Sequence, residues 1–355
     1  MLKFRWKVFV ITVIGQFIMT SLLLGGAKVP NILSVLDLKS KPQVNLTTPE
    51  PQTPIFETIK SKLEIKGDSF KLRTKTSLVP SAFASAEYDN AVAYIVVDFE
   101  TGEILAEKDS NLKIPIASIT KTMTAMVALD LAEIEEIFTV SKRATEEVPT
   151  KVMLRAGEKA TLELLINSLM VSSANDAAYA IADGIDQKYG AELFLRSMNE
   201  KAKLLDLKAS SFTNPNGLDD ADHLSSAEDV AIMSRYALKN YPQLEAIVKK
   251  ELVEFSDPSG DERFNLRNWN GLLGVYPGVA GIKIGNTGRA GYTTSVVAER
   301  EGKKILVVVL GAPGVYERDL WAAELLDQGF SKFNIKGANV TRDQLKEKYA
   351  SWKRD

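Results

Sequence analysis

From about residue 88 onward, apolar positions follow a strand pattern at both ends of the chain and a helical pattern between them. Residues 93–98 are apolar and β-branched, which predicts a strand, and 104–107 are its predicted return after a turn. A second hairpin is predicted from 291–298 and 304–310, because a short polar turn separates two β-branched segments. We therefore predict an antiparallel sheet with helices packed on it, of the α/β (α+β) class.

Between and after the hairpins, apolar residues spaced three or four apart predict six helices. In chain order these are 118–129, 161–170, 175–182, 191–205, 225–238 and 319–333. Thr161 is the expected N-cap of the second helix. Ser225 and Glu228 have the spacing of a capping box and are expected to open the fifth.

The N-terminus has a different composition from the rest of the chain. Lys3, Arg5 and Lys7 precede an apolar run from 8 to 24, which small residues up to Ala27 close. Residues 1–27 are therefore predicted to be a signal peptide, cleaved after Ala27, or an uncleaved membrane anchor. The basic flank predicts a cytoplasmic N-terminus, so we expect the remainder outside the cytoplasm, anchored in the membrane or secreted.

Composition indicates the remaining domain boundaries and excludes some kinds of functional site. Recurrent prolines without a sustained period predict a linker over 28–86, followed by a compact domain over 87–335 and a charged tail over 336–355. The formal net charge of −2 gives no sign of a nucleic-acid partner. The chain has no cysteine and a single histidine, His223, which excludes cysteine chemistry and argues against a zinc peptidase site. We expect neither a metal nor a cofactor.

Candidate chemistry begins at Ser118 and Lys121, at the start of the first predicted helix. Residues three apart lie on one face of a helix, so the hydroxyl and the amine would face the same pocket. The free backbone N–H groups of a first helical turn favour a developing oxyanion. Ser118 is thus a candidate nucleophile with the Lys121 amine as its base. Taken alone, the pattern is weak and is more typical of a capped helix with a solvated lysine.

Two further motifs follow in the same order along the chain. Ser173 and Asn175 form an S-x-N element at the turn into the third helix, and Lys283 and Gly285 form a K-x-G element that opens the first late strand. S-x-x-K, S-x-N and K-x-G resemble the signature of penicillin-binding proteins and class A β-lactamases. From about residue 91 to 333, the chain resembles the D-alanyl-D-alanine carboxypeptidases, the low-molecular-mass penicillin-binding proteins. The segments that carry this likeness are 115–121, 173–178, 213–218, 268–270 and 281–287.

The resemblance implies a fold and a function. The fold is β-lactamase/transpeptidase-like, an antiparallel sheet flanked by helices plus an all-helical lobe, with the site between lobe and sheet and Lys283 on the edge strand. The implied function is that of a serine-type D-Ala-D-Ala carboxypeptidase, which trims peptidoglycan stem peptides through an acyl-serine intermediate. β-Lactams would act as inhibitors by acylating the same serine.

The resemblance also implies a role for each site residue. Ser118 attacks the carbonyl between the two D-alanines, Lys121 takes its proton, and Ser173 relays a proton to the departing D-alanine. Lys121 can act as a base only when its amine is neutral, so burial and a second cation, Lys283, are expected to lower its pKa. The backbone N–H groups of Ser118 and Asn286 would form the oxyanion hole. The implied substrate-binding residues are Asn175, Lys283, Gly285, Asn286 and Thr287.

One residue departs from the family pattern. Ile284 stands where the family's Lys-Thr-Gly triplet has a threonine, so a hydroxyl that could bond the substrate's carboxylate is missing. A lost hydrogen bond to a charged group costs roughly 1.5–3 kcal/mol, so we expect weaker substrate binding with the chemistry retained. Thr287 is a candidate for a substitute hydroxyl.

Several alternatives remain open. A D,D-endopeptidase of cross-linked peptidoglycan shares the chemistry, and it fits the expectation that no second β-rich domain follows Phe333. A β-lactamase is disfavoured, because Glu163 precedes the S-x-N element and fits a helix stripe. A catalytically weak peptidoglycan-binding or penicillin-sensing protein has only Ile284 in its support. His223 lies in a segment that resembles a structural part of the family and is not expected to be catalytic.

Overall fold

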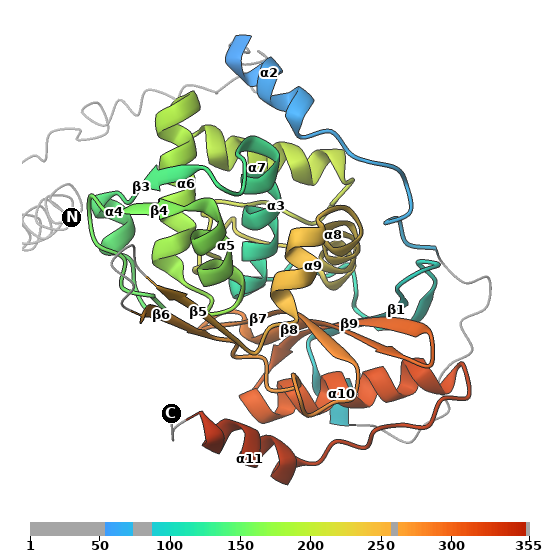
Figure 1. Cartoon of the computed structure of the whole chain (residues 1–355). Helices are drawn as coiled ribbons and strands as arrows, with labels where there is room; N and C mark the ends of the chain where they lie inside the picture. Colours follow the sequence, from blue (N-terminus) through green and yellow to red (C-terminus); the bar gives the residue numbers. More distant parts are fainter. Residues whose placement is uncertain (1–53, 74–86, 257–261, 353–355) are drawn as a thin grey trace, which may run out of the picture. The chain divides into compact units, whose positions relative to one another are not determined.

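Five strands form a central antiparallel sheet: β1 (Ala93–Asp98), β2 (Ile104–Lys108), β7 (Val279–Thr287), β8 (Gly291–Arg300) and β9 (Lys303–Ala312). Their order is β2-β1-β9-β8-β7 (Figure 1), so the two predicted hairpins are confirmed and lie in one sheet. The computed structural model describes residues 54–73, 87–256 and 262–352. The predicted signal peptide or anchor, residues 1–27, lies outside these residues.

The apolar residues of β9 alternate between two hydrophobic cores, one on each face of the sheet. Ile305 and Val307 contribute to the core that includes α10 (Val315–Ser331). Leu306 and Val308 contribute to the core shared with the helices on the opposite face. Successive side chains of a strand point to opposite faces. A strand covered on both faces therefore has a continuous apolar run, as this segment does.

The face opposite α10 carries α8 and an all-helical lobe, as expected from the resemblance (Figure 1). The helices on this side are α3 (Lys121–Leu131), α4 (Lys142–Thr145), α5 (Leu162–Met170), α6 (Asn175–Tyr189), α7 (Leu193–Leu204), α8 (Ala227–Asn240) and α9 (Pro242–Val248). Two short 3₁₀ turns, η2 (Glu87–Asn90) and η3 (Ala117–Thr120), precede β1 and α3.

Two small hairpins were not predicted from the sequence. One pairs β3 (Ile137–Thr139) with β4 (Lys159–Thr161), and the other pairs β5 (Leu252–Ser256) with β6 (Glu262–Arg267). The first has strands of three residues, which is too short for an alternating pattern to be recognised.

The helix boundaries follow the predicted capping residues with one shift. Thr161 caps α5 and accepts a hydrogen bond from the backbone N–H of Leu164 at 3.2 Å, as predicted. In α8 the cap is Ser226 rather than Ser225, because the Ser226 hydroxyl accepts from the N–H of Asp229 at 3.1 Å. The predicted third helix is correct in its start and continues to Tyr189.

Strand β7 corrects the position of the K-x-G element. Lys283 lies inside a separate edge strand that precedes the hairpin, and not at the opening of the first late strand as expected. The segment escaped prediction because it contains two glycines and an asparagine, residues that are depleted in strands. Lys283 is nevertheless on the edge strand, as the resemblance implied.

Part of the predicted linker contacts the domain. Helix α2 (Pro54–Lys62) places Phe56 and Ile59 in the main core, and Leu63 follows them there. This part of the predicted linker is therefore packed against the domain through its apolar residues.

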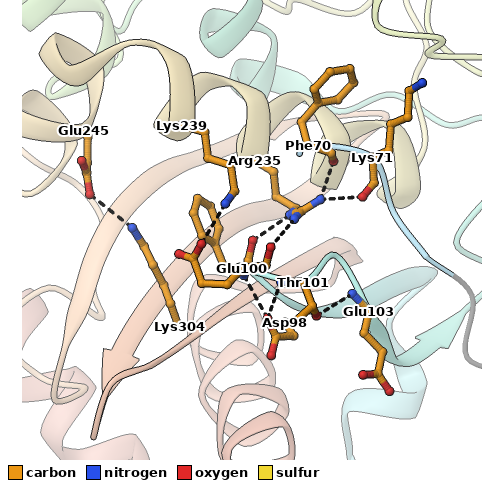
Figure 2. A network of polar contacts seen from close by, with 11 residues as sticks. Phe70, Lys71, Asp98, Glu100, Thr101, Glu103, Arg235, Lys239, Glu245 and Lys304 are labelled. Atoms are coloured by element: carbon orange, nitrogen blue, oxygen red, sulfur yellow. Dashed lines mark hydrogen bonds and ion pairs between the residues drawn. The ribbon is translucent and has the colours of Figure 1, made fainter. Parts of the chain in front are cut away.

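The end of this segment is attached through Arg235, a fully buried residue of α8 (Figure 2). Its guanidinium donates hydrogen bonds to four backbone carbonyl oxygens, those of Phe70 (2.5 Å), Lys71 (2.7 Å), Phe99 (2.9 Å) and Glu100 (3.2 Å). One side chain thereby joins the segment before the domain to the turn between β1 and β2. Burial lowers the pKa of Arg235 to about 10, which leaves it charged at neutral pH.

The predicted charged tail also contains a helix, α11 (Arg342–Ser351). Thr341 and Gln344 form a capping box at its start, and Leu345 is fully buried against the α10 side of the sheet. The helix is polar on most of its surface, so its sequence gave no apolar stripe to predict it from. Within the three described ranges, no helix is long and apolar enough to cross a membrane.

Candidate active site

Ser118 lies in η3, the single 3₁₀ turn that leads directly into α3. Thr120 stabilises this turn. Its hydroxyl donates to the carbonyl of Ala117 at 2.8 Å and lies 2.7 Å from His223 Nε2. His223 Nδ1 accepts from the backbone N–H of Thr213 at 3.1 Å, so the ring proton is on Nε2 and points at Thr120. Burial lowers the pKa of His223 to about 4, which keeps it neutral. His223 therefore supports the turn, as expected, and is not a triad base.

The amine of Lys121 makes the central contact of the site. Its Nζ atom lies 2.8 Å from Ser118 Oγ, 2.8 Å from Asn175 Oδ1 and 2.7 Å from the carbonyl oxygen of Asn216. Lys121 is completely buried. A neutral amine has two N–H groups and one lone pair. Because Asn175 Oδ1 and the Asn216 carbonyl can only accept, they take both N–H groups and leave the lone pair directed at Ser118.

Two causes lower the pKa of Lys121 well below its ordinary value. Burial is the larger, and the charge of Lys283 is the second. Asp176 and Glu147 act in the opposite direction, but more weakly. Burial and the charge of Lys283 thus act in the expected direction, towards the neutral amine.

Ser173 and Lys283 meet on the other side of the site. The Nζ atom of Lys283 donates to Ser173 Oγ at 2.9 Å and to the carbonyl of Ile284 at 2.9 Å. Burial, followed by the charge of Arg318, lowers the pKa of Lys283 to about 7. Ser173 has a φ of 60°, an uncommon backbone conformation for a residue with a side chain. Such conformations persist where the surroundings hold them, often at functional sites.

Asn175 begins α6 and is held from two sides. Its Nδ2 donates to the carbonyl of Val148 at 2.9 Å, which orients Oδ1 towards Lys121. The expected role of this amide is to bind the substrate. In the structure, its oxygen and one of its N–H groups are already engaged, and one N–H remains for a ligand.

Gly285 allows β7 to approach Ser118. A Cβ atom built on Gly285 would lie 2.6 Å from the backbone nitrogen of Ser118, a distance that no real Cβ contact shows. The absent side chain lets β7 pass close to the Ser118 N–H, and the next residue of the strand, Asn286, lines the same cavity as Ser118. This proximity is what an oxyanion hole made from these two backbone groups requires.

A cavity of about 350 Å³ joins these elements between the lobe and the sheet. Its lining residues are Ser118, Pro149, Thr150, Ser173, Asn175, Leu218, Trp269, Ile284, Gly285, Asn286 and Thr287. All the site residues singled out from the sequence line it, except the two buried lysines that point at its serines. The structure thus brings the three motifs together.

Thr287 does not offer the substitute hydroxyl considered above. Its Oγ1 donates to Asp219 Oδ1 at 2.5 Å and accepts from the backbone N–H of Ala290 at 3.1 Å. The hydroxyl proton is therefore directed at a carboxylate outside the cavity, and Ile284 has no replacement from this position.

Two residues of the site were not identified from the sequence. Asn216 accepts from Lys121 through its carbonyl, and its Nδ2 donates to Glu147 Oε2 at 3.2 Å. Asn216 lies in segment 213–218, which carries part of the family likeness. The sequence therefore contains a signal that could have identified it. Glu147 lies in an irregular loop with no pattern that could have marked it.

No group of three or more histidine, aspartate or glutamate residues suited to a metal ion occurs in the part of the chain that the structure describes. The donors around Ser118 are amines, amides and hydroxyls, which are suited to acyl transfer by the protein's own side chains.

Comparisons with known proteins agree with this arrangement. A family model described as D-alanyl-D-alanine carboxypeptidase matches residues 81–314, which include all three motifs. The D-alanyl-D-alanine carboxypeptidase DacF of Bacillus subtilis is 34% identical over 271 residues, which cover 72% of this chain and 68% of DacF. DacB2 of Mycobacterium tuberculosis is 30% identical over 249 residues, 68% of this chain and 82% of its own. The solved DD-transpeptidase of Streptomyces K15 is similar in structure, with a TM-score of 0.64 and 28% identity over 68% of this chain and 97% of that one.

Proposed function

Because this chain belongs to the D-alanyl-D-alanine carboxypeptidase family, we propose that it removes the terminal D-alanine from peptidoglycan stem peptides and is acylated by β-lactams at Ser118. The observation that carries this proposal is the contact between Lys121 Nζ and Ser118 Oγ, with both N–H groups of the neutral amine bound elsewhere. A protein that only bound peptidoglycan, without becoming acylated, would not need a buried base directed at its serine.

Acylation begins when Lys121 takes the proton of the Ser118 hydroxyl. The oxygen attacks the carbonyl carbon between the two D-alanines, and negative charge develops on the carbonyl oxygen. The backbone N–H groups of Ser118 and Asn286 stabilise that charge, which is often the largest single contribution to such catalysis. Burial lowers the pKa of Lys121 and so favours the neutral amine, which is the form that can act as a base.

The C–N bond then breaks, and the departing amine receives a proton. Ser173 is placed for this relay, since its hydroxyl contacts Lys283 Nζ and lines the same cavity as Ser118. The first product is free D-alanine, and the rest of the peptide remains as an ester of Ser118. Water hydrolyses the ester, which releases the shortened peptide and restores the serine.

Substrate binding uses the edge strand and the motif residues around it. Lys283 supplies the positive charge for the terminal carboxylate, and Asn175 offers its remaining N–H to the acyl part of the peptide. Gly285 lets the peptide and Ser118 approach the strand closely. A β-lactam carries a carboxylate next to its reactive amide, so it satisfies the same groups.

We propose that this domain works outside the cytoplasm, on a chain that is anchored by residues 1–27 or released after their cleavage. The support is the one-sided positive charge of Lys3, Arg5 and Lys7 ahead of an apolar run. Protease added to intact cells would degrade an external domain and spare an internal one. The mass of the protein on a gel would distinguish the anchored chain from the cleaved one.

Release of D-alanine tests the enzymatic proposal directly. The full-length protein is incubated with a pentapeptide that ends in D-Ala-D-Ala, and both products are quantified. Equal amounts of D-alanine and tetrapeptide are expected, with none from Ser118→Ala. Binding of the pentapeptide without release by the wild-type protein would favour the sensing role.

A further inference from the structure

Helix α11 lies beside α10 (Figure 1) and brings a tyrosine to a buried ion pair. The pair consists of Arg318 and Asp319, consecutive residues of α10, and Arg318 Nε donates to Asp319 Oδ1 at 2.7 Å. Tyr349 of α11 bridges the two. Its hydroxyl accepts from Arg318 Nη2 at 2.8 Å and donates to Asp319 Oδ2. The three side chains therefore form a closed ring of hydrogen bonds.

This ring fixes the position of a positive charge. Nε and Nη2 lie on one edge of the planar guanidinium, so two partners on that edge determine the orientation of Arg318. Burial raises the pKa of Tyr349 well above its ordinary value, so the hydroxyl keeps the proton that it donates. Burial opposes the charge of Arg318, but Asp319, Tyr349 and Tyr292 outweigh it, and the pKa of Arg318 lies above its ordinary value. Arg318 is therefore a permanent cation.

The charge of Arg318 lies beside the edge strand of the catalytic site. Arg318 lines the same pocket as Ile284 and Asn286 of β7. Lys283 directly precedes Ile284 in this strand, and it is buried as well. Two like charges repel each other more strongly in a buried site than in water. This repulsion agrees with the effect of Arg318 on Lys283, whose pKa it lowers in addition to burial.

Other ionisable groups act on this pair of cations from the neighbouring elements. Lys121, at the start of α3, is coupled to the charge of Lys283, and its own pKa is lowered well below the ordinary value. Tyr292 of β8 acts on Arg318. The direct partner of Lys283, Ser173, is an uncharged hydroxyl. Arg318 is thus the cation near Lys283 whose orientation depends on α11.

The end of α11 is also packed against the wall of the catalytic cavity. A Cβ atom built on Gly271 would lie 2.6 Å from the Tyr349 hydroxyl oxygen and still closer to Asp319 Oδ2, so the backbone of this loop covers the ring of hydrogen bonds. Trp269 of the same loop lines the catalytic cavity. The ring of Trp352 contacts Tyr349 and Trp269 edge to face, with centroid distances of 4.6 and 5.3 Å.

From this geometry we propose that Tyr349 is a positioning residue of the active site, which holds the Arg318 guanidinium beside β7 and thereby helps to set the charge of Lys283. The helix of the C-terminal tail is then a functional part of the catalytic domain. Arg318 and α11 both lie beyond residues 81–314, the range that the family model matches. The inference rests on the proposed function, in which Lys283 holds the carboxylate of the substrate.

The pH dependence of KM tests this inference on the full-length protein. The substrate is a peptide that ends in D-Ala-D-Ala with a free carboxylate, and the same peptide with a terminal carboxamide is measured beside it. In the wild type, the charge of Lys283 is present below a pKa of about 7 and is lost above it, so KM for the free acid should rise above that pH. KM for the carboxamide should stay level.

Tyr349→Phe keeps the ring and removes the bridging hydroxyl. The guanidinium is then held less firmly, its repulsion of Lys283 weakens, and the pKa of Lys283 should rise. The increase in KM should therefore move to higher pH by about half a unit, which corresponds to an about threefold lower KM than in the wild type near pH 8.5. Tyr349→Met also lacks the hydroxyl, in a side chain that adapts to the available space, and gives the same expectation if the phenylalanine variant does not fold.

Tyr316→Phe is the matched control. The ring of Tyr316 packs edge to face on Tyr349, with the centroids 5.5 Å apart, and its hydroxyl makes no hydrogen bond with the residues that the structure describes. Loss of this hydroxyl changes the same aromatic cluster without changing the partners of Arg318. Its KM profile should therefore coincide with that of the wild type. Circular dichroism shows that each variant is folded before its profile is measured.

The two proposals fail in different ways. Folded Tyr349 variants whose KM rises at the same pH as in the wild type, or at a lower pH, would overturn the role of Tyr349 and leave the carboxypeptidase proposal standing. An equal shift in Tyr316→Phe would also overturn that role, because the effect would not depend on the bridging hydroxyl. A wild-type protein that releases no D-alanine and takes no penicillin label would overturn both.

Discussion

Lys121 Nζ lies 2.8 Å from Ser118 Oγ, and the other two oxygens that it contacts can only accept hydrogen bonds. The direction of the lone pair is therefore fixed by Asn175 and Asn216 before any substrate binds. Preorganisation of this kind lowers the cost of reaching the transition state. The base depends on residues far apart in the sequence, which come together only in the folded chain.

The charge of Glu147 should influence the pH at which the site becomes active. Glu147 raises the pKa of Lys121, in opposition to burial and Lys283. Glu147→Gln removes that charge but keeps an oxygen that can accept from Asn216, so the pKa of Lys121 should fall further. Since the neutral amine is the base, the rate of acylation increases with pH through this pKa. The acidic limb of the pH–rate profile should therefore move to lower pH in the variant. This shift is measured by recording the rate of penicillin acylation as a function of pH. An acidic limb that stays in place or moves to higher pH would contradict the assignment of Lys121 as the base.

The protonation of Lys283 should limit the binding of carboxylates at high pH. Its pKa is about 7 in the free site, so the charge is present below that pH and is lost above it. For a peptide ending in a free carboxylate, KM should rise above pH 7. The same peptide ending in a carboxamide does not depend on this charge, and its KM should stay level. Equal increases for both peptides would show that Lys283 does not hold the carboxylate.

Restoring the family hydroxyl should strengthen acylation. Ile284→Thr supplies a donor for the carboxylate of penicillin, and a hydrogen bond to a charged group is worth roughly 1.5–3 kcal/mol, so the second-order acylation rate should rise by about tenfold or more. Ile284→Val is the matched control, because valine has the shape of threonine without the hydroxyl. An equal rate in the threonine and valine variants would refute the hydroxyl account.

The buried guanidinium of Arg235 should stabilise both the domain and the segment before it (Figure 2). Arg235→Met leaves four backbone carbonyls without their donor, and unfolding in urea should show a loss of about 3 kcal/mol. Amide exchange in 54–73 should increase at the same time. Lys239→Met is the control, because Lys239 pairs with a mostly exposed Glu100 carboxylate and should cost below about 1 kcal/mol. Similar losses in the two variants would mean that the four carbonyls gain little from Arg235.

The main part of the fold and the motif residues could be predicted because their signals are local. The β-branched run of β9 is visible without any partner, and the spacing of Ser118 and Lys121 places both on one helix face. The identity of Lys283 as the second cation followed from the family likeness. Each of these inferences needed only a few neighbouring residues.

The parts that escaped prediction depend on distant contacts. Strand β7 has a composition unsuited to a strand, because Gly285 is required where Ser118 approaches. Helix α11 is polar on most sides. It is held against the domain by buried Leu345 and by the aromatic contact of Trp352 with Trp269. Glu147 raises the pKa of Lys121 from a loop whose structure no local sequence pattern predicts. None of these relations can be read from a window of sequence.

The measurement that tests the central claim most directly is covalent labelling of the full-length protein with a fluorescent penicillin, beside Ser118→Ala. The account predicts one label for each wild-type molecule, located on Ser118 by mass spectrometry of the digested protein, and none in the variant. A label that persists in folded Ser118→Ala, or a folded wild-type protein that takes no label, would contradict the assignment of Ser118 as the nucleophile.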